Sequence, residues 1–366
     1  MLKNKTIAVV VPAYNEESQI EMVINTMPDF VDRIVIVNDK SKDKTNEVVH
    51  QCIRKDEKDW SNPSIAEHKP EANRYNEAEQ VVWEMSQKEK AWFTRSEIVN
   101  ESPENDRIIL INHLDNGGVG AAIATGYKWC KDMNIDCTAV MAGDGQMDPS
   151  ELESICLPVI DDDVDYVKGN RLIHQSARMV IPRHRFFGNS VLSILTKIAS
   201  GYWRVSDTQT GYTAISLAAL NAIELYKIYP RYGMPNDMLV KLNIAGSTLR
   251  EIPIKPVYRV GEQSKMKIRK VIPKISWLLL RSFFKRLWQK YFVRNFHPLF
   301  LLYAFSFLLF AASLPFLVYI LDNAFTINQT TPNSILLIFI FLIIFSFQSL
   351  LFAMWMDIQD NERLYK

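Results

Sequence analysis

The stretch TIAVVVPAYNEESQIEMVINTMPDFVDRIVIVNDKSKDKT, residues 6–45, decides the fold class. It begins with an apolar run, Thr6–Val11, and continues with helical spacing of apolar residues over Glu16–Met27. A second apolar run, Arg33–Val37, precedes another helical segment, Lys42–Cys52. Short continuous apolar runs are typical of strands that are covered on both faces. Their alternation with helices predicts an α/β domain whose mostly parallel sheet has helices on both faces.

The strand-then-helix pattern returns over residues 107–133 and 136–160. Residues 53–105 interrupt it, because they are rich in Glu, Lys, Asn and Gln. We interpret them as a charged insertion, partly helical around Glu77–Phe93, in a domain that spans residues 1–265. We expect no chemistry in the insertion, and a regulatory or partner-docking lid stays open as the alternative.

Two segments near the C-terminus, 298–321 and 334–356, are almost wholly apolar. Each is long enough to cross a hydrocarbon core of about 30 Å as a helix. Helices buried in a soluble core are the alternative, but such helices rarely run this long without a polar stripe. We therefore predict two transmembrane helices.

The charges around these segments predict their orientation. Residues 265–297 carry ten Lys or Arg and no Asp or Glu, whereas the loop 322–333 carries no Lys or Arg. The positive-inside rule then places the N-terminal domain and a tail, 357–366, in the cytoplasm, with the spans in the cell (inner or plasma) membrane. The first apolar run is too short for a signal peptide, and the four cysteines show no metal-ligand spacing, which fits reduced thiols in the cytoplasm.

Residues 266–297 mix apolar and basic side chains at helical spacing. Amphipathic helices of this kind lie in the interface of anionic membranes, and a solvated charged helix is the plainer alternative. The adjacent spans favour the membrane interpretation.

Polar motifs follow four of the expected strands, where open α/β sheets bind their ligands. Any one of them could be a turn or a helix cap, but four at one sheet edge indicate a ligand site. The motifs are Pro12-Ala13-Tyr14-Asn15-Glu16, Asn38-Asp39-Lys40-Ser41, Asn116-Gly117-Gly118-Val119-Gly120 and Gly143-Asp144-Gly145-Gln146-Met147-Asp148.

Each motif suits a part of a nucleotide site. Asp39 could accept hydrogen bonds from a base or ribose. Asp144 could bind a hard divalent cation, Mg²⁺ or Mn²⁺, and Gln146 could add a carbonyl ligand, so that the ion neutralises a leaving diphosphate. The glycines of Asn116–Gly120 stand where a backbone must approach a ligand closely, and no Gly-Lys-Ser/Thr follows that would make this segment a P-loop.

As an ordered set, the motifs resemble those of family 2 glycosyltransferases of GT-A fold. More narrowly they resemble the dolichol-phosphate mannose synthase and polyprenyl-phosphate glycosyltransferase group. The resemblance covers residues 1–50, 107–265 and the spans, with one departure: Ala142 stands where the metal motif usually has its first carboxylate. Other matching elements are Gly169-Asn170-Arg171, Asp207–Tyr212 with Gln209 and Gly211, Asn236–Leu239, and Arg259–Lys265.

The resemblance implies a role for each matched position. Asp237 falls on the catalytic carboxylate. Asp144 is expected to be catalytic as well, through the metal that it would hold together with Gln146. Arg171, Arg259 and Lys265 would surround the lipid phosphate or the donor diphosphate. Arg185 would join them, with Arg183 an equal candidate. The residues expected at the nucleotide are Pro12, Ala13, Tyr14, Glu16, Asp39, Asn116, Gly117, Gly120, Gly143 and Asp144.

The resemblance also implies an inverting displacement at the anomeric carbon of a UDP- or GDP-linked sugar. A sugar hydroxyl acceptor needs a general base, whereas a lipid monophosphate, with a second pKa of about 6, is already anionic. The basic segment Arg259–Lys265 fits the lipid phosphate, although simple attraction to anionic lipids would also explain it. We therefore predict transfer to a polyprenyl phosphate, undecaprenyl or dolichyl.

Two other functions compete with this prediction. Transfer to a glycolipid or growing polysaccharide is one, but a processive synthase needs more spans and a Gln-x-x-Arg-Trp motif, which is absent. An inactive membrane scaffold is the other, and the retention of Asp39, Asp144 and Asp237 argues against it. We expect no nucleic-acid partner, and the resemblance leaves a homo-oligomer assembled through the spans open.

Overall fold

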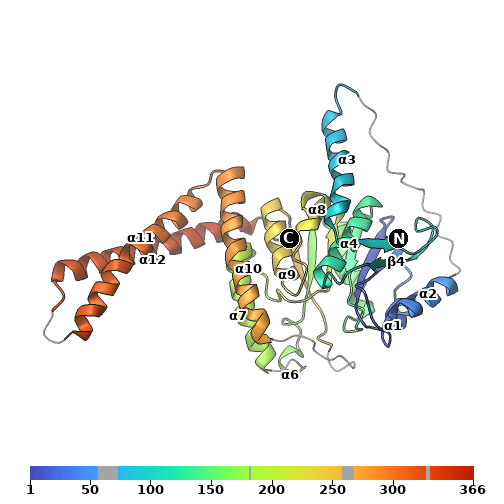
Figure 1. Cartoon of the computed structure of the whole chain (residues 1–366), viewed down its shortest axis with the longest axis horizontal. Helices are drawn as coiled ribbons and strands as arrows, with labels where there is room; N and C mark the ends of the chain where they lie inside the picture. Colours follow the sequence, from blue (N-terminus) through green and yellow to red (C-terminus); the bar gives the residue numbers. More distant parts are fainter. Residues whose placement is uncertain (57–72, 181–182, 258–267, 327–329) are drawn as a thin grey trace.

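The computed structural model describes residues 1–56, 73–180, 183–257, 268–326 and 330–366 (Figure 1). Its sheet has eight strands in the order β3-β4-β2-β1-β5-β7-β6-β8. Strands β3 and β7 pair antiparallel with their neighbours, and the other pairs are parallel. The strands are β1 (Ile7–Ala13), β2 (Arg33–Asn38), β3 (Ser96–Ile98), β4 (Ile108–His113), β5 (Cys137–Val140), β6 (Tyr166–Asn170), β7 (Thr213–Ser216) and β8 (Leu249–Pro253).

Helices cover both faces of the sheet, as the apolar strands predict. Alternate residues of a strand point to opposite faces, so Val10 joins the core under α4 and α9, while Val9 joins the core under α1, α2 and α5. The helices of the domain are α1 (Ile20–Asn25), α2 (Thr45–Lys55), α3 (Glu77–Glu89), α4 (Val119–Asp132), α5 (Leu152–Asp161), α6 (Ala177–Val180), α7 (Arg183–Ser200), α8 (Leu217–Ala222) and α9 (Met234–Ala245).

The first helix is shorter than the sequence pattern suggests. The pattern extends over Glu16–Met27, but α1 begins only at Ile20. The preceding residues are held by the next loop instead, because the amides of Asn15 and Glu16 donate to Ser41 Oγ (3.0 Å) and Thr45 Oγ1 (2.9 Å). Side-chain acceptors of this kind satisfy backbone donors that have no helical partner.

The charged insertion also contributes to the sheet. Helix α3 matches the helical part expected around Glu77–Phe93 and projects from the body of the domain (Figure 1). Beyond it, β3 pairs with β4 and forms one edge of the sheet. The insertion therefore supplies an edge strand, which its polar composition did not suggest.

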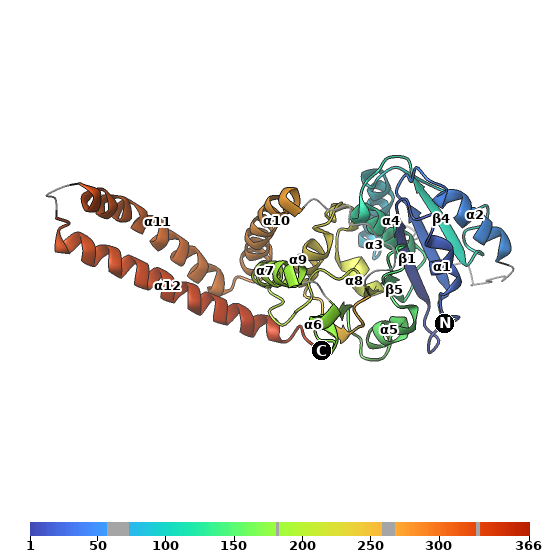
Figure 2. The same cartoon turned by 90° about the horizontal axis from the view of Figure 1, so that it is seen from below.

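The C-terminal part consists of α10 (Ile268–Trp288), a π-helical turn (Gln289–Arg294), α11 (Pro298–Phe325) and α12 (Asn333–Glu362). Helices α11 and α12 are long and apolar enough to cross a membrane and are mostly exposed. They lie side by side as a hairpin that extends away from the sheet, with α7 and α10 between hairpin and sheet (Figures 1 and 2). Both helices continue beyond the expected limits, 298–321 and 334–356.

The last residues do not form a free tail. Helix α12 runs to Glu362, and the chain then follows β8, where the Leu249 amide donates to the Leu364 carbonyl at 2.7 Å. Leu364 enters the core under α4 and α9. Residues 357–366, predicted as a cytoplasmic tail, therefore comprise the last turns of α12 and a short segment beside β8.

Candidate functional site

The four polar motifs leave the sheet at one edge, as the parallel strands predict. Strands β1, β2, β4 and β5 run in the same direction, and the register pairs Ala13 with Asn38 and Asn38 with Asn112. Strands β6 and β8 also end at this edge, and the loop 207–212 enters β7 from it. We call this side of the sheet the catalytic edge.

Asp39 organises the centre of the catalytic edge. Its Oδ1 accepts hydrogen bonds from the Gly117 amide (2.7 Å) and from His113 Nδ1 (2.8 Å), and its Oδ2 accepts from the Gly118 amide (2.8 Å). Burial alone would raise the pKa of Asp39, but these hydrogen bonds lower it below its ordinary value. Three of the about four acceptor positions of the carboxylate are thus used within the fold, and the side chain is buried. The nucleotide contact expected of Asp39 stays a prediction.

His113 is a site residue that sequence reasoning missed. It ends β4 and is buried between Asp39 and Thr125, whose Oγ1 lies 2.9 Å from Nε2. Because a carboxylate only accepts, Nδ1 is the donor to Asp39, and Nε2 lies within hydrogen-bond distance of the threonine hydroxyl. The sequence held a weak signal, namely a histidine at the end of an otherwise apolar strand.

The glycine loop approaches the chain itself rather than open space. A Cβ at Gly120 would lie 2.1 Å from the Tyr229 carbonyl oxygen, and one at Gly118, where φ is +92°, would lie 2.6 Å from that of Pro230. The Gly120 and Ala121 amides, at the start of α4, donate to the Pro230 carbonyl at 2.9 and 3.2 Å. Gly118 and Gly120 therefore pack closely against residues 229–230, whereas Gly117 packs against Thr94. The nucleotide contacts expected of Asn116, Gly117 and Gly120 stay a prediction.

Asp237 lies in the first turn of α9, next to this contact. Its Oδ2 accepts from the Tyr229 amide at 2.8 Å and pairs closely with Lys241 Nζ, one turn later. Both side chains are nearly buried, and burial lowers the pKa of Lys241 against the attraction of Asp237. The catalytic carboxylate implied by the motif is thus a member of an ion pair.

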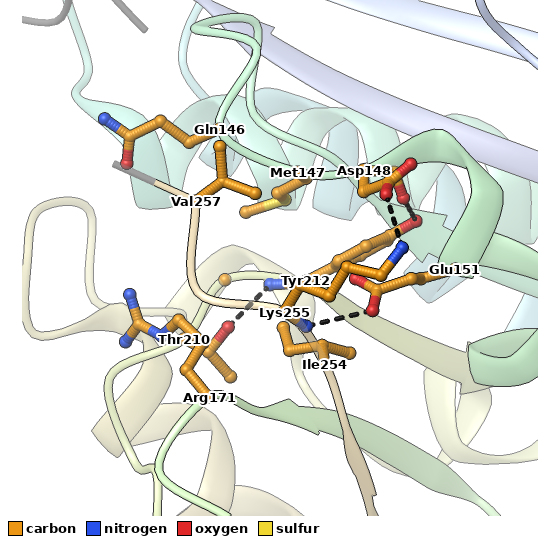
Figure 3. Close-up of a pocket in the computed structure, with 11 residues that line it drawn as sticks. Gln146, Met147, Asp148, Glu151, Arg171, Thr210, Tyr212, Ile254, Lys255 and Val257 are labelled. Carbon is orange, nitrogen blue, oxygen red and sulfur yellow. Dashed lines mark hydrogen bonds and ion pairs between the residues drawn. The ribbon is translucent and has the colours of Figure 1, made fainter. Parts of the chain in front are cut away.

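A small pocket, of about 40 Å³, opens beside the β5 motif (Figure 3). Lys255 closes one wall: its Nζ lies 3.1 Å from Asp148 Oδ2 and its amide donates to Glu151 Oε1 at 2.9 Å. Tyr212 donates its hydroxyl to the Asp148 carbonyl at 3.0 Å. Predicted residues that line the same pocket are Gln146, Arg171 and Gly211, and the others are Met147, Thr210, Ile254 and Val257.

Arg171 has a carboxylate partner in the fold. Its Nε and Nη2 donate to the two oxygens of Asp207 at 2.8 and 3.1 Å. Burial would raise the pKa of Asp207, and the arginine charge lowers it. Sequence analysis placed Asp207 in a matching motif but gave it no role. Its role here is to hold Arg171 at the rim of the pocket in a two-point pair.

Gln209 links the same loop to the helix of Asp237. Its Nε2 donates to Asn236 Oδ1 at 2.8 Å, and Asn236 directly precedes the catalytic candidate. Asn236 Oδ1 also accepts from Thr196 of α7 at 3.0 Å. The loop 207–212, α7 and α9 are therefore held together behind the catalytic edge.

The other predicted residues are partly placed. Ala13 is buried and Pro12, Tyr14 and Glu16 are half-buried at the end of β1, while Gly143 donates to the Pro12 carbonyl at 3.4 Å. Asn116 donates to the Asp39 carbonyl at 3.0 Å. Arg259 and Lys265 lie outside the described residues, as do the side chains of Arg183 and Arg185 on α7.

The residues around Asp144 fit a cation that is shared with a phosphate ligand. Asp144 is half-buried and its Oδ1 accepts the Gln146 amide at 3.1 Å. Across the described parts of the chain, no three His, Cys, Asp or Glu side chains gather into a metal cage. Mg²⁺ is commonly bound by one or two carboxylates plus substrate phosphates, which a single aspartate can satisfy.

Comparison with known proteins decides the family. The model of the glycosyl transferase family 2 matches residues 8–65 and 90–223, which include the motifs of β1, β2, β4 and β5. The chain is a family 2 glycosyltransferase. The resemblance seen in the motifs is confirmed, and so is the α/β architecture with two apolar C-terminal helices.

Two relatives and one solved structure illustrate what the chain is similar to. The UDP-N-acetylglucosamine–dolichyl-phosphate N-acetylglucosaminyltransferase of Methanococcus voltae is 29% identical over 263 residues, 70% of this chain and 88% of the relative. The polyprenol monophosphomannose synthase of Mycolicibacterium smegmatis is 25% identical over 181 residues, 47% of this chain and 65% of the relative. Glucosyl-3-phosphoglycerate synthase from Mycobacterium tuberculosis, solved with Mn²⁺ and UDP, aligns over 77% of this chain and 80% of its own with a TM-score of 0.46 and 14% identity.

Proposed function

We propose that this glycosyltransferase moves a sugar from a nucleoside diphosphate sugar to a polyprenyl phosphate at the cytoplasmic face of a membrane. The observation that carries the proposal is the attachment of a family 2 domain to a hairpin long enough to span a bilayer. Relatives that act on dolichyl or polyprenyl phosphate support it. Of the two acceptors predicted from the sequence, dolichyl phosphate is the first to test, because it is named for the Methanococcus relative.

We infer that the donor carries UDP, and UDP-N-acetylglucosamine is the first candidate on the same ground. The nucleotide would bind at the ends of β1 and β2, where the pair of loops is cross-linked by the hydrogen bonds of Asn15 and Glu16. We assign Asp39, at the end of β2, to the base or ribose, as the sequence predicts. Tyr14 and Glu16 are half-buried there and can both reach a ligand and be fixed by the fold.

The reaction is one displacement. A phosphate oxygen of the lipid attacks the anomeric carbon, and the bond from that carbon to the diphosphate breaks on the opposite face, which inverts the configuration. A divalent cation at Asp144 would neutralise the leaving diphosphate. Because the acceptor is already anionic, the protein must chiefly align it and screen its charge. We assign the alignment to Asp237 and the screening to Arg171, with Arg259, Lys265 and the Arg183–Arg185 region as further candidates.

The topology follows from the two ends of the hairpin. The chain enters α11 after α10 and the π-helical turn Gln289–Arg294, and α10 packs on α7. It leaves α12 into contacts with β8. If the hairpin crosses the bilayer, both of its ends and the catalytic domain are on one side. The ten basic residues of 265–297 support the proposal that this side is cytoplasmic.

The test is a transfer assay with the purified full chain in nanodiscs. Radiolabelled UDP-N-acetylglucosamine, UDP-glucose and GDP-mannose are each offered with dolichyl or undecaprenyl phosphate. We expect the label to appear on a lipid and to be released from it by mild acid, because a sugar linked through one phosphate is acid-labile. Label found only on an acid-stable glycolipid would support the alternative acceptor. Donor binding without turnover on any acceptor would identify an inactive scaffold.

A further inference from the structure

A buried ion pair joins the membrane hairpin to the catalytic domain. Arg286 of α10 and Asp357 of α12 are both fully buried. The guanidinium donates from Nη1 to Oδ1 at 2.7 Å and from Nη2 to Oδ2 at 2.8 Å. Two parallel hydrogen bonds fix the orientation of the partners as well as their distance.

The same guanidinium holds the end of α7. Its Nε donates to the Ala199 carbonyl at 3.0 Å and its Nη2 to the Ile198 carbonyl at 3.1 Å. Carbonyls in the last turn of a helix lack helical partners, so Arg286 caps α7. Gly201 makes room for it, because a Cβ there would lie 2.6 Å from Nη1. Arg286 therefore connects α7, α10 and α12.

A second set of buried contacts reaches α9, the helix of Asp237. Asn243 of α9 donates to Asn361 of α12 at 2.7 Å and accepts from Lys290 at 3.1 Å. Tyr291 adds a hydrogen bond to Asp357 at 2.8 Å. The side chains of these residues are nearly or fully buried. The polar groups of this cluster are hydrogen-bonded to one another. A buried polar network whose groups are satisfied in this way fixes one packing arrangement of the helices.

The last three residues add a third attachment, at the outer edge of the sheet. Besides the Leu249–Leu364 hydrogen bond, the Lys366 amide donates to the Leu249 carbonyl at 3.2 Å, and Arg250 Nε donates to the Lys366 carbonyl at 2.8 Å. The Tyr365 hydroxyl accepts from the Arg204 amide at 2.7 Å. The chain end thus extends the sheet beside β8, the strand that leads to Lys255 and the pocket.

We propose that residues 357–366, which we call the C-terminal clamp, are positioning residues for the transfer reaction. Together with Arg286 they hold the catalytic edge in one orientation relative to the hairpin, so that the edge meets an acceptor phosphate at the membrane surface. A loose hairpin would keep the domain at the membrane but would let the edge take many orientations, and misalignment lowers the rate of a displacement steeply. The proposal rests on the proposed function for the nature of the acceptor.

The test compares two acceptors in one loosened variant. The variant carries Arg286→Met and Asp357→Leu and ends at Arg363. Replacing both ion partners by apolar residues avoids an unpaired buried charge. Transfer is measured to dolichyl phosphate in nanodiscs and to water-soluble geranyl phosphate. We expect kcat/KM for dolichyl phosphate to fall about tenfold or more, with transfer to geranyl phosphate and the donor Kd nearly unchanged.

Thr196→Val is the matched control. It removes the α7 contact to Asn236 but leaves the clamp intact, so we expect transfer to both acceptors to change by the same factor. If the loosened variant also lost both activities equally, the clamp would serve only the fold. If it lost neither, Arg286 and the clamp would have no positioning role. Either result overturns the proposal.

A distance measurement tests the C-terminal clamp without using any acceptor. Spin labels on Glu153→Cys, in α5, and Phe325→Cys, at the end of α11, report the distance between domain and hairpin, and the four native cysteines are buried. We expect a narrow distance distribution in the otherwise native chain and a broad one in the loosened variant. Distance distributions of equal width in the two proteins would overturn the proposed role of the C-terminal clamp. Absence of transfer from the native chain to any prenyl phosphate would instead overturn the proposed function, and the two widths would still decide on the clamp.

Discussion

Asp237→Asn is the substitution that most directly tests the catalytic assignment, and the structure shows why it needs a partner variant. The asparagine keeps an oxygen that can accept from the Tyr229 amide, so the turn before α9 should persist. The negative charge opposite Lys241 is lost, however, and both side chains are only 10% exposed. A single substitution therefore changes the stability of the fold as well as the chemistry of the site.

The two effects have similar magnitudes. Breaking a buried ion pair costs about 3–5 kcal/mol, and the lower value applies here, because Lys241 retains some solvent and burial already lowers its pKa. A loss of about 3 kcal/mol corresponds to a fall in Tm of roughly 6–12 °C for a domain of this size. Loss of a positioned catalytic carboxylate costs about 10²-fold or more in turnover, which is about 2.7 kcal/mol in barrier height.

The double variant Asp237→Asn with Lys241→Met separates them. It removes both charges, so most of the lost Tm should return in thermal unfolding of the nanodisc-embedded chain. Transfer to dolichyl phosphate should stay about 10²-fold below the native rate. Recovery of both Tm and transfer would refute the reasoning, because it would reduce the role of Asp237 to neutralising Lys241. Native transfer in the single variant would remove Asp237 from the site altogether.

Three further predictions concern the metal, Asp39 and the glycine loop. Chelation with EDTA should abolish transfer and added Mg²⁺ or Mn²⁺ should restore it, and full activity in EDTA would mean that Ala142 marks a metal-independent enzyme. Because the pKa of Asp39 is lowered from 3.8 in the fold, its ionised form contributes to stability fully above that pH, and the contribution is lost as the pH falls through the folded-state pKa. Asp39→Asn should therefore lower Tm at pH 7, and the difference from the native chain should begin to shrink only as the pH falls below 3.8; a difference that shrank mainly above that pH would contradict this. Gly120→Ala should destabilise the domain by about 1–3 kcal/mol in thermal unfolding, because its Cβ would meet the Tyr229 carbonyl at 2.1 Å, and an unchanged Tm would show that residues 229–230 move freely.

The sheet and its catalytic edge could be predicted because they depend on periodicity. Continuous apolar runs such as Thr6–Val11 mark strands covered on both faces, and parallel strands must end on one side. The antiparallel β3 and β7 could not be found in this way. Strand β3 is three residues long and exposed, so it has no apolar pattern, and its pairing depends on β4 alone.

The side-chain partners could not be predicted because they come from distant parts of the chain. The sequence identified Asp39 and the glycine loop separately. It did not show that the Asp39 carboxylate accepts a hydrogen bond from the Gly117 amide, 78 residues later. It identified Arg171 as a phosphate ligand, but it did not identify Asp207, 36 residues later, as the carboxylate that holds Arg171 in place. Local motifs indicate which chemical groups are present. The fold determines which of these groups face a ligand and which contact each other.

The ion pairs of the site carry a further consequence for the reaction. Arg171 is paired with Asp207, Lys255 with Asp148 and Lys241 with Asp237, so each of these cations already has a carboxylate. A donor diphosphate and a lipid phosphate would bring several negative charges to this edge. Paired cations neutralise them only in part, since each keeps its own counter-charge. The remaining neutralisation must come from a divalent cation at Asp144 and from basic residues beyond these pairs, for which Arg259 and Lys265 are the candidates. Transfer should therefore depend on both together, and a charge-removing change at Arg259 or Lys265 should raise the Mg²⁺ concentration needed for half-maximal transfer.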